Sequence, residues 1–285
     1  MASHLDRIVY LNGEFIQGCD AKLSIFDRGL LFADAVYEGL GVLHGQLIDV
    51  DMHLKRLNRS LNELAIPNPL NDTELLLVLN RLIAENEVHE GFVYLHITRG
   101  EADRDYSYTD ELVPNVFAFT QPQGHQSASS IASGVRMISH EDLRWKRRDI
   151  KTSNLLGQVI AKQAATNAGA YGALLIDDEG FVTEGGATSF FIVKGNAILT
   201  RPVTNEILHG ITRQAMLKVA EREGFNVTVQ KFSLEEAYNA DEAFITGASS
   251  YIEPVVEIDG NKIADGEPGP ITVKLRAEYL RLVQM

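Results

Sequence analysis

The apolar and polar positions in the first fifty residues predict two β-hairpins. Each has a strand, a two-residue turn that contains glycine, and a returning strand. The first hairpin covers residues 8–16 around the turn Asn12-Gly13, and the second covers residues 36–50 around His44-Gly45. Tight turns of this composition join adjacent antiparallel strands, so the pattern indicates an antiparallel sheet near the start of the chain.

Helical spacing follows the second hairpin. Asp51 is expected to cap a helix that ends before Pro67, with an apolar face made of Leu54, Leu57, Leu61 and Leu64. A second helix is expected over about residues 72–86, and two further strands over residues 92–98 and 116–120. Strands and helices mixed in this order predict a small α+β domain.

A polar, turn-rich segment at residues 121–129 predicts a linker between a small domain over residues 1–120 and a larger domain over residues 130–285. Two modest domains suit a chain of 285 residues. Beyond the linker, short strands punctuated by glycine alternate with helices. The expected strands are 135–139, 172–176, 181–183, 190–193 and 197–200, and the expected helices are about 155–168, 212–223 and 271–282.

Composition narrows the classes of function. The formal net charge is −13 and no long basic block is present, which argues against nucleic acid as a partner. No apolar run approaches the length of about 18 residues that a membrane-spanning helix needs. The N-terminus has no signal-peptide pattern, and the single Cys19 excludes an internal disulfide and a cysteine metal cluster. We therefore expect a cytoplasmic location.

A basic run from Arg144 leads to Lys151. Thr152, Ser153 and Asn154 then supply N-cap chemistry for an expected helix. The apolar positions of that helix are Leu155, Leu156, Val159, Ile160 and Ala164. An imine-forming lysine needs a fixed amine whose charge its neighbours can suppress, and a lysine held just before a packed helix meets that need. Taken alone, these features also fit an ordinary surface lysine.

Residues 145–163, together with Val182-Thr183-Glu184-Gly185, resemble the fold type IV enzymes that use pyridoxal phosphate, the class IV aminotransferases. Within that family the chain is most similar to the D-amino acid aminotransferases, from Asp27 to Gly247. The resemblance implies an α+β fold with a small α/β domain and a larger β-barrel-like domain. It also implies that Lys151 forms an imine with pyridoxal 5'-phosphate and later moves the proton between the substrate Cα and the cofactor C4′.

Two further side chains are expected beside the cofactor ring. The resemblance makes Glu184 the acid that keeps the pyridine nitrogen protonated, whereas on its own it could be a turn acid that caps backbone amides. Arg144 matches a position that in some relatives lies beside the phenolic oxygen. A positive charge there favours the ionised oxygen.

The phosphate group needs a helix N-terminus or basic residues. The amides of Ile211 and Thr212 open an expected helix, although an ordinary capped helix would show the same pattern. In the family the arginine that matches Arg56 contacts the phosphate. Where relatives commonly have threonine this chain has Ala248, so we expect the hydroxyl of Ser249 to serve instead.

Recognition of the substrate carboxylate distinguishes the subclasses. The D-amino acid enzymes use a tyrosine, an arginine and a histidine, which match Tyr37, Arg104 and Tyr106 in this chain. A phenol in place of the histidine can donate a hydrogen bond but brings no positive charge. Arg28 could add a second guanidinium at the rim of the pocket, or serve as a structural arginine in a tight turn. The resemblance implies that the arginine loop comes from the neighbouring subunit, so we expect a homodimer.

The implied reaction is ping-pong: an amino donor leaves its amine on the cofactor, and a 2-oxo acid such as 2-oxoglutarate or pyruvate collects it. Within the same fold, three alternatives stay open. They are a branched-chain L-amino acid aminotransferase, an aminodeoxychorismate lyase and an (R)-amine transaminase. A branched-chain enzyme usually has a longer chain and lacks the Arg104-Asp105-Tyr106 type of motif. A non-catalytic binding protein would be expected to lose Lys151 or Glu184, and both are present.

Overall fold

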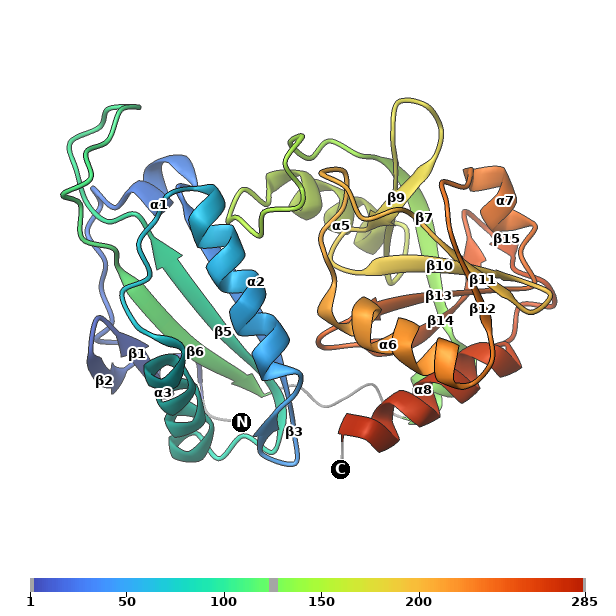
Figure 1. Cartoon of the computed structure of the whole chain (residues 1–285), viewed down its shortest axis with the longest axis horizontal. Coiled ribbons are helices and arrows are strands. Elements are labelled where there is room, and N and C mark those ends of the chain that lie inside the picture. The colour runs from blue at the N-terminus through green and yellow to red at the C-terminus, as the bar shows by residue number, and fades with distance from the viewer. Residues whose placement is uncertain (1–2, 123–127, 284–285) are drawn as a thin grey trace. The chain divides into compact units, whose positions relative to one another are not determined.

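The computed structural model describes residues 3–122 and 128–283 of the chain (Figure 1). These residues form two compact units. The first comprises the described part of residues 1–125 together with residues 150–154, and the second comprises the described part of residues 126–149 together with residues 155–285. The centre of the predicted linker, residues 123–127, lies outside the described residues.

The first unit is built on a six-stranded antiparallel sheet with the strand order β2-β1-β6-β5-β3-β4. Its strands are β1 Ile8–Leu11, β2 Glu14–Gln17, β3 Ala35–Leu43, β4 Gln46–Leu47, β5 Glu90–Thr98 and β6 Val116–Pro122. Both predicted hairpins are confirmed. Asn12 and Gly13 have φ angles of 48° and 100°, which suit the left-handed positions of a tight hairpin turn.

Two long helices cover one face of this sheet (Figure 1). The helices of the unit are α1 Arg28–Phe32, α2 Val50–Glu63 and α3 Asp72–Glu85. Leu54, Leu57 and Leu61 of α2 are buried in the core between helices and sheet, as their spacing predicts. The predicted cap at Asp51 is wrong: the helix begins after Asp49, and Asp51 lies in the first turn, where its charge favours the helix dipole.

Residues 150–154, which contain Lys151, pack with the first unit, whereas the sequence assigned them to the second domain. The cause is pairing with β3. Thr152 forms a bridge with Val36, and the backbone N–H of Tyr37 donates to the carbonyl of Lys151 at 3.0 Å. Backbone hydrogen bonds of this kind hold the lysine segment to a central strand of the first sheet.

The second unit contains a nine-stranded mixed sheet around its own apolar core. The strand order is β12-β11-β10-β13-β14-β7-β8-β9, and β15 pairs with β14. The strands are β7 Val135–Glu141, β8 Gly172–Ile176, β9 Val182–Gly185, β10 Ser189–Lys194, β11 Ala197–Thr200, β12 Asn226–Val229, β13 Glu242–Gly247, β14 Tyr251–Ile258 and β15 Asn261–Lys262. The helices are α4 Ala128–Ser133, α5 Leu156–Asn167, α6 Ile211–Arg222, α7 Leu234–Tyr238 and α8 Pro270–Val283.

Helix α5 differs from its prediction in two ways. Its N-cap is Leu155, without a side-chain capping bond, so the predicted cap at residues 152–154 is wrong. The apolar side chains Leu156, Val159 and Ile160 are exposed, and the helix instead buries small alanines against β8. No helix in the described ranges has both the length and the apolar character that a membrane crossing requires.

Candidate active site

Lys151 lies half-buried beside Tyr37 in the first unit. Its Nζ is 4.2 Å from the centroid of the Tyr37 ring, close enough for a cation–π contact. The N–H of Lys151 donates to Ser60 Oγ at 3.3 Å, and its carbonyl accepts from Tyr37. Two residues that the sequence predicted for different tasks are therefore neighbours, and the main chain of the lysine is fixed from both sides.

Arg56 takes part in a buried ionic cluster. Its Nε and Nη2 each donate to the carboxylate of Glu38 at 2.8 Å, and His53 Nδ1 lies 2.7 Å from the same carboxylate. Burial would raise the pKa of Glu38, but Arg56 and His53 hold it well below its ordinary value. The sequence did not predict a role for Glu38 or His53. The one available signal was a glutamate inside the otherwise apolar strand β3.

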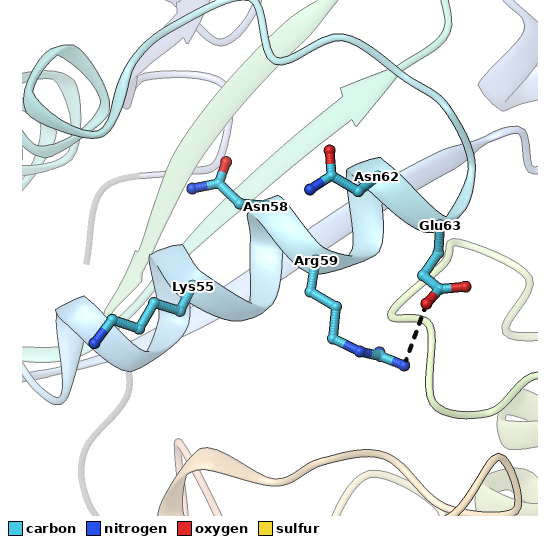
Figure 2. Close-up of a pocket in the computed structure, with 5 residues that line it drawn as sticks. All are labelled: Lys55, Asn58, Arg59, Asn62 and Glu63. Carbon is cyan, nitrogen blue, oxygen red and sulfur yellow. Dashed lines mark ion pairs between the residues drawn. The ribbon is translucent and has the colours of Figure 1, made fainter.

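The opposite, polar side of α2 borders an open hollow of about 660 Å³ (Figure 2). Lys55, Asn58, Arg59, Asn62 and Glu63 line it, and Arg59 pairs with Glu63 at 3.8 Å. None of the predicted site residues is among them. Arg56 comes from the same helix but is only 7% exposed, so its chemistry lies with β3 and not with this hollow.

The predicted carboxylate residues Arg104 and Tyr106 lie on an exposed loop of the first unit. Tyr106 is 78% exposed. The guanidinium of Arg104 is 5.5 Å from the ring centroid of Phe32 and 5.6 Å from that of Tyr106. Arg28, by contrast, is buried, and it donates hydrogen bonds to Asp34 and to main-chain carbonyls of this loop. The structure thus groups Arg28, Arg104 and Tyr106 at one loop, while Tyr37 lies with Lys151.

In the second unit, Glu184 lies near the end of strand β9 and is buried. Arg144 Nη1 donates to its carboxylate, and the N–H of Leu208 donates to Oε1 at 3.1 Å. Burial raises the pKa of Glu184, although Arg144 and the Leu208 amide oppose the rise. Arg144 in turn donates from Nε and Nη2 to Asp142 at 2.8 and 2.7 Å. The sequence missed Asp142, whose only signal was its position two residues before Arg144.

The start of helix α6 has the features of an anion site. Ile211 and Thr212 are buried, and the N-cap Gly210 makes no side-chain capping bond. A Cβ at Gly210 would lie 2.7 Å from Ser189 Oγ, so glycine lets strand β10 and the helix approach this closely without displacing that hydroxyl. Helix N-termini of this kind bind phosphate through their unpaired amides.

Two hydroxyls near this helix start are orphaned. Ser189 pairs with Thr246 across β10 and β13. Thr246 Oγ1 and Ser250 Oγ are both buried and have no hydrogen-bond partner among the described residues. Ser249, the predicted phosphate ligand, is exposed in the turn between them. Because buried hydroxyls are normally paired, these two fit a bound polar group such as a phosphate.

Comparison with known proteins agrees with this geometry. The amino-transferase class IV family model matches residues 35–258. A D-alanine aminotransferase of Bacillus licheniformis is 40% identical over 264 residues, 93% of each chain. A D-alanine aminotransferase of Staphylococcus aureus is 36% identical over 281 residues, 97% of this chain and 98% of the relative.

Among solved structures, a branched-chain amino acid aminotransferase with pyridoxamine 5'-phosphate, from the organism abbreviated T.th., has a TM-score of 0.92 and 26% identity. The match covers 98% of this chain and 94% of that one. A branched-chain aminotransferase of Thermoproteus uzoniensis with norvaline has a TM-score of 0.86 and 26% identity, over 97% and 94% of the two chains. On the family match and on the near-complete alignment with these relatives, the chain belongs to the class IV aminotransferases.

Proposed function

We propose that the chain is a pyridoxal-phosphate-dependent aminotransferase that moves the amino group of a D-amino acid, of which D-alanine is the type, to a 2-oxo acid such as 2-oxoglutarate. The observation that carries the proposal is an identity of 36–40% to D-alanine aminotransferases over 93–97% of the chain. The reaction runs as two half-reactions in a ping-pong order. Its substrates are small molecules, and a cytoplasmic location stays a prediction.

The residues present fit the cofactor. The amides that open α6, beside the orphaned hydroxyls of Thr246 and Ser250, suit a phosphate. The residues that would hold the phosphate are Ile211, Thr212, Ser249 and Arg56. Glu184 would lie at the ring nitrogen and Arg144 at the phenolic oxygen. When bound, pyridoxal phosphate supplies an aldehyde that condenses with amines and a ring that accepts electrons.

Lys151 would bind the cofactor and later carry the proton between the substrate Cα and C4′. Its main chain is fixed by Tyr37 and Ser60, so the amine can swing on its own side chain without losing its place. Glu184 would hold the proton at the ring nitrogen. Its burial and its hydrogen bonds from Arg144 and Leu208 support a fixed, water-free carboxylate for that task.

Tyr37, Arg104 and Tyr106 would bind the α-carboxylate, with the planar fork of Arg104 as the main partner. We propose a homodimer in which the loop that carries Arg104 completes the site of the neighbouring subunit. Exposed apolar side chains support a covered surface here: Ile25 is 71% exposed, Leu30 70% and Val113 78%. Apolar patches of this kind on a folded chain mark interaction sites.

A branched-chain L-amino acid aminotransferase is the second candidate, because branched-chain enzymes overlay on the chain with TM-scores of 0.86 to 0.92. Their identity of 26% is well below that of the D-alanine enzymes. An (R)-amine transaminase and an aminodeoxychorismate lyase use the same lysine chemistry and are tested alongside.

A donor panel tests the proposal. The purified holoenzyme is assayed with D-alanine, L-leucine and (R)-phenylethylamine, each with 2-oxoglutarate as acceptor, and separately with aminodeoxychorismate. The expected result is the highest kcat/KM for D-alanine. Faster turnover of L-leucine would replace the proposal with the branched-chain activity, and a preference for either remaining donor would assign the chain to that activity.

A further inference from the structure

The loop that carries Arg104 and Tyr106, residues 101–113, connects strands β5 and β6 and is exposed along most of its length. In Figure 1 this green loop projects beyond the end of the sheet beside α1. Long exposed loops are mobile unless specific contacts tie them down. Its usefulness for binding a carboxylate therefore depends on what fixes its main chain.

The guanidinium of Arg28 supplies such contacts at the centre of the loop. Nη1 donates to the carbonyls of Asp105 at 2.7 Å and Ser107 at 3.1 Å, and Nη2 donates to the carbonyl of Tyr106 at 3.3 Å. One planar cation thus gathers three successive carbonyl oxygens. The bound stretch starts one residue after Arg104 and includes Tyr106 itself.

Arg28 is in turn fixed by its surroundings. It is 3% exposed, and its Nε donates to Asp34 at 2.9 Å. Arg99 binds the same carboxylate, through Nε at 2.8 Å and Nη2 at 3.0 Å. Burial would raise the pKa of Asp34, but hydrogen bonds from Arg99 and Arg28 lower it, so the carboxylate stays ionised. The base of the loop is also tied, since the N–H of Arg28 donates to the carbonyl of Gly100 at 2.9 Å.

An aromatic contact continues the arrangement to Arg104. The ring of Phe32 lies 4.9 Å from the guanidinium of Arg28 and 5.5 Å from that of Arg104. The same ring packs against Tyr106 with 5.5 Å between centroids. Helix α1 therefore contacts both predicted carboxylate side chains through Phe32, while Arg28 at its start holds their main chain.

We propose that Arg28 is a positioning residue for α-carboxylate recognition: it fixes the turn at residues 105–107 so that Arg104 and Tyr106 face the substrate. This inference rests on the proposed function, in which those two side chains bind the carboxylate. It also gives Arg28 a different task from direct contact with substrate. Its Nε, Nη1 and Nη2 all donate to protein oxygens, and the side chain is almost wholly buried.

The test compares Arg28→Gln and Arg28→Lys with Arg7→Gln in the holoenzyme. Arg7 also donates to a main-chain carbonyl of the first unit, that of Thr120, which lies outside the loop. For Arg28→Gln we expect KM for D-alanine and 2-oxoglutarate to rise about 10- to 100-fold, the range that a misplacement of about 1 Å produces. The kcat for D-alanine should change far less, and turnover of an amine without a carboxylate should stay near the wild-type value.

A second readout does not depend on activity. Trypsin cleavage after Arg104, followed by the masses of the fragments, reports how firmly the loop is held. We expect faster cleavage in Arg28→Gln than in the wild type or Arg7→Gln. Arg28→Lys should give an intermediate rate and an intermediate KM, because an ammonium cannot span the same set of oxygens. If Arg28→Gln does not fold, the lysine variant carries both measurements.

The outcomes separate the two proposals. Unchanged KM values in both Arg28 variants, in an enzyme where Arg104→Ala raises KM, would overturn the role of Arg28. So would equal losses with and without a substrate carboxylate. If Arg104→Ala leaves KM unchanged, the assignment of Arg104 fails instead, and the positioning role falls with it even where cleavage accelerates.

Discussion

Glu253 gives the sharpest prediction of stability. It lies on β14, is 0% exposed, and neither carboxylate oxygen has a well-formed hydrogen bond to a described residue. Burial raises the pKa of Glu253 to about 7, against the opposing influence of Arg276 and Tyr171. The guanidinium of Arg276 is directed to the carbonyls of Ser250 and Ile252.

The sign of the pH effect follows from which state binds the proton more tightly. The ordinary pKa of this side chain is 4.5, so the folded chain keeps a proton that the unfolded chain has lost between pH 4.5 and 7. The stabilisation from this proton is complete below about pH 4.5 and is lost as the pH rises to about 7. A shift of about 2.5 units at about 1.4 kcal/mol each corresponds to about 3 kcal/mol.

Glu253→Gln removes the titration and keeps the shape. The free energy of unfolding of the variant, relative to the wild type, should therefore increase by about 3 kcal/mol between pH 4.5 and pH 8. Urea unfolding at fixed protein and cofactor concentrations, at several pH values, measures that difference. Glu257→Gln, on the same strand but partly exposed, is the matched control. Parallel curves for Glu253→Gln and the wild type would refute the reasoning, since they would mean that Glu253 does not hold a proton in the folded state.

Three further predictions concern the candidate site. Lys151→Ala should abolish transamination and the borohydride-sensitive absorbance at about 400–430 nm while leaving the fold intact; retained turnover would refute the assignment of the lysine. Arg104→Ala should impair amino and 2-oxo acids far more than amines without a carboxylate, and equal losses in steady-state assays would contradict that role. Glu38→Gln should lower the free energy of unfolding by about 3–5 kcal/mol, because it leaves Arg56 and His53 without their buried counter-charge. A change below about 1 kcal/mol in urea unfolding would argue against a charged cluster there, since that is the size of a surface pair.

The hairpins could be predicted because each has a glycine turn and alternating apolar positions, but strands β13 and β14 could not. Strand β14 is buried at nearly every position and so shows no alternation. It also contains Pro254, which lacks the N–H that a central strand needs and therefore argues against a strand. The three-dimensional pairing with β13 and β7 overrides both signals.

Helix α5 shows the opposite limit. Its apolar spacing predicted a packed face, yet Leu156 is 68% exposed and Val159 is 59% exposed. A sequence pattern reveals which residues are apolar but not whether the chain itself covers them. The alanines that do pack, Ala161 and Ala165, allow close approach to β8 but carry little hydrophobic signal.

The site residues divide along similar lines. Motifs marked the cations Arg56 and Arg144, but not the acids that hold them, Glu38 and Asp142. An isolated acid in a sequence is usually solvated, so only the pairing in the fold separates these acids from surface residues. A carboxylate that binds a guanidinium through two nitrogens fixes both the plane and the direction of that cation.

For Arg104 the neighbours recorded in the structure are ring faces, those of Phe32 and Tyr106. A ring face attracts a cation but does not set the direction of its donors in the way that a carboxylate does. The orientation of Arg104 must therefore come from its main chain, which is why the contacts of Arg28 with residues 105–107 matter for recognition of the substrate.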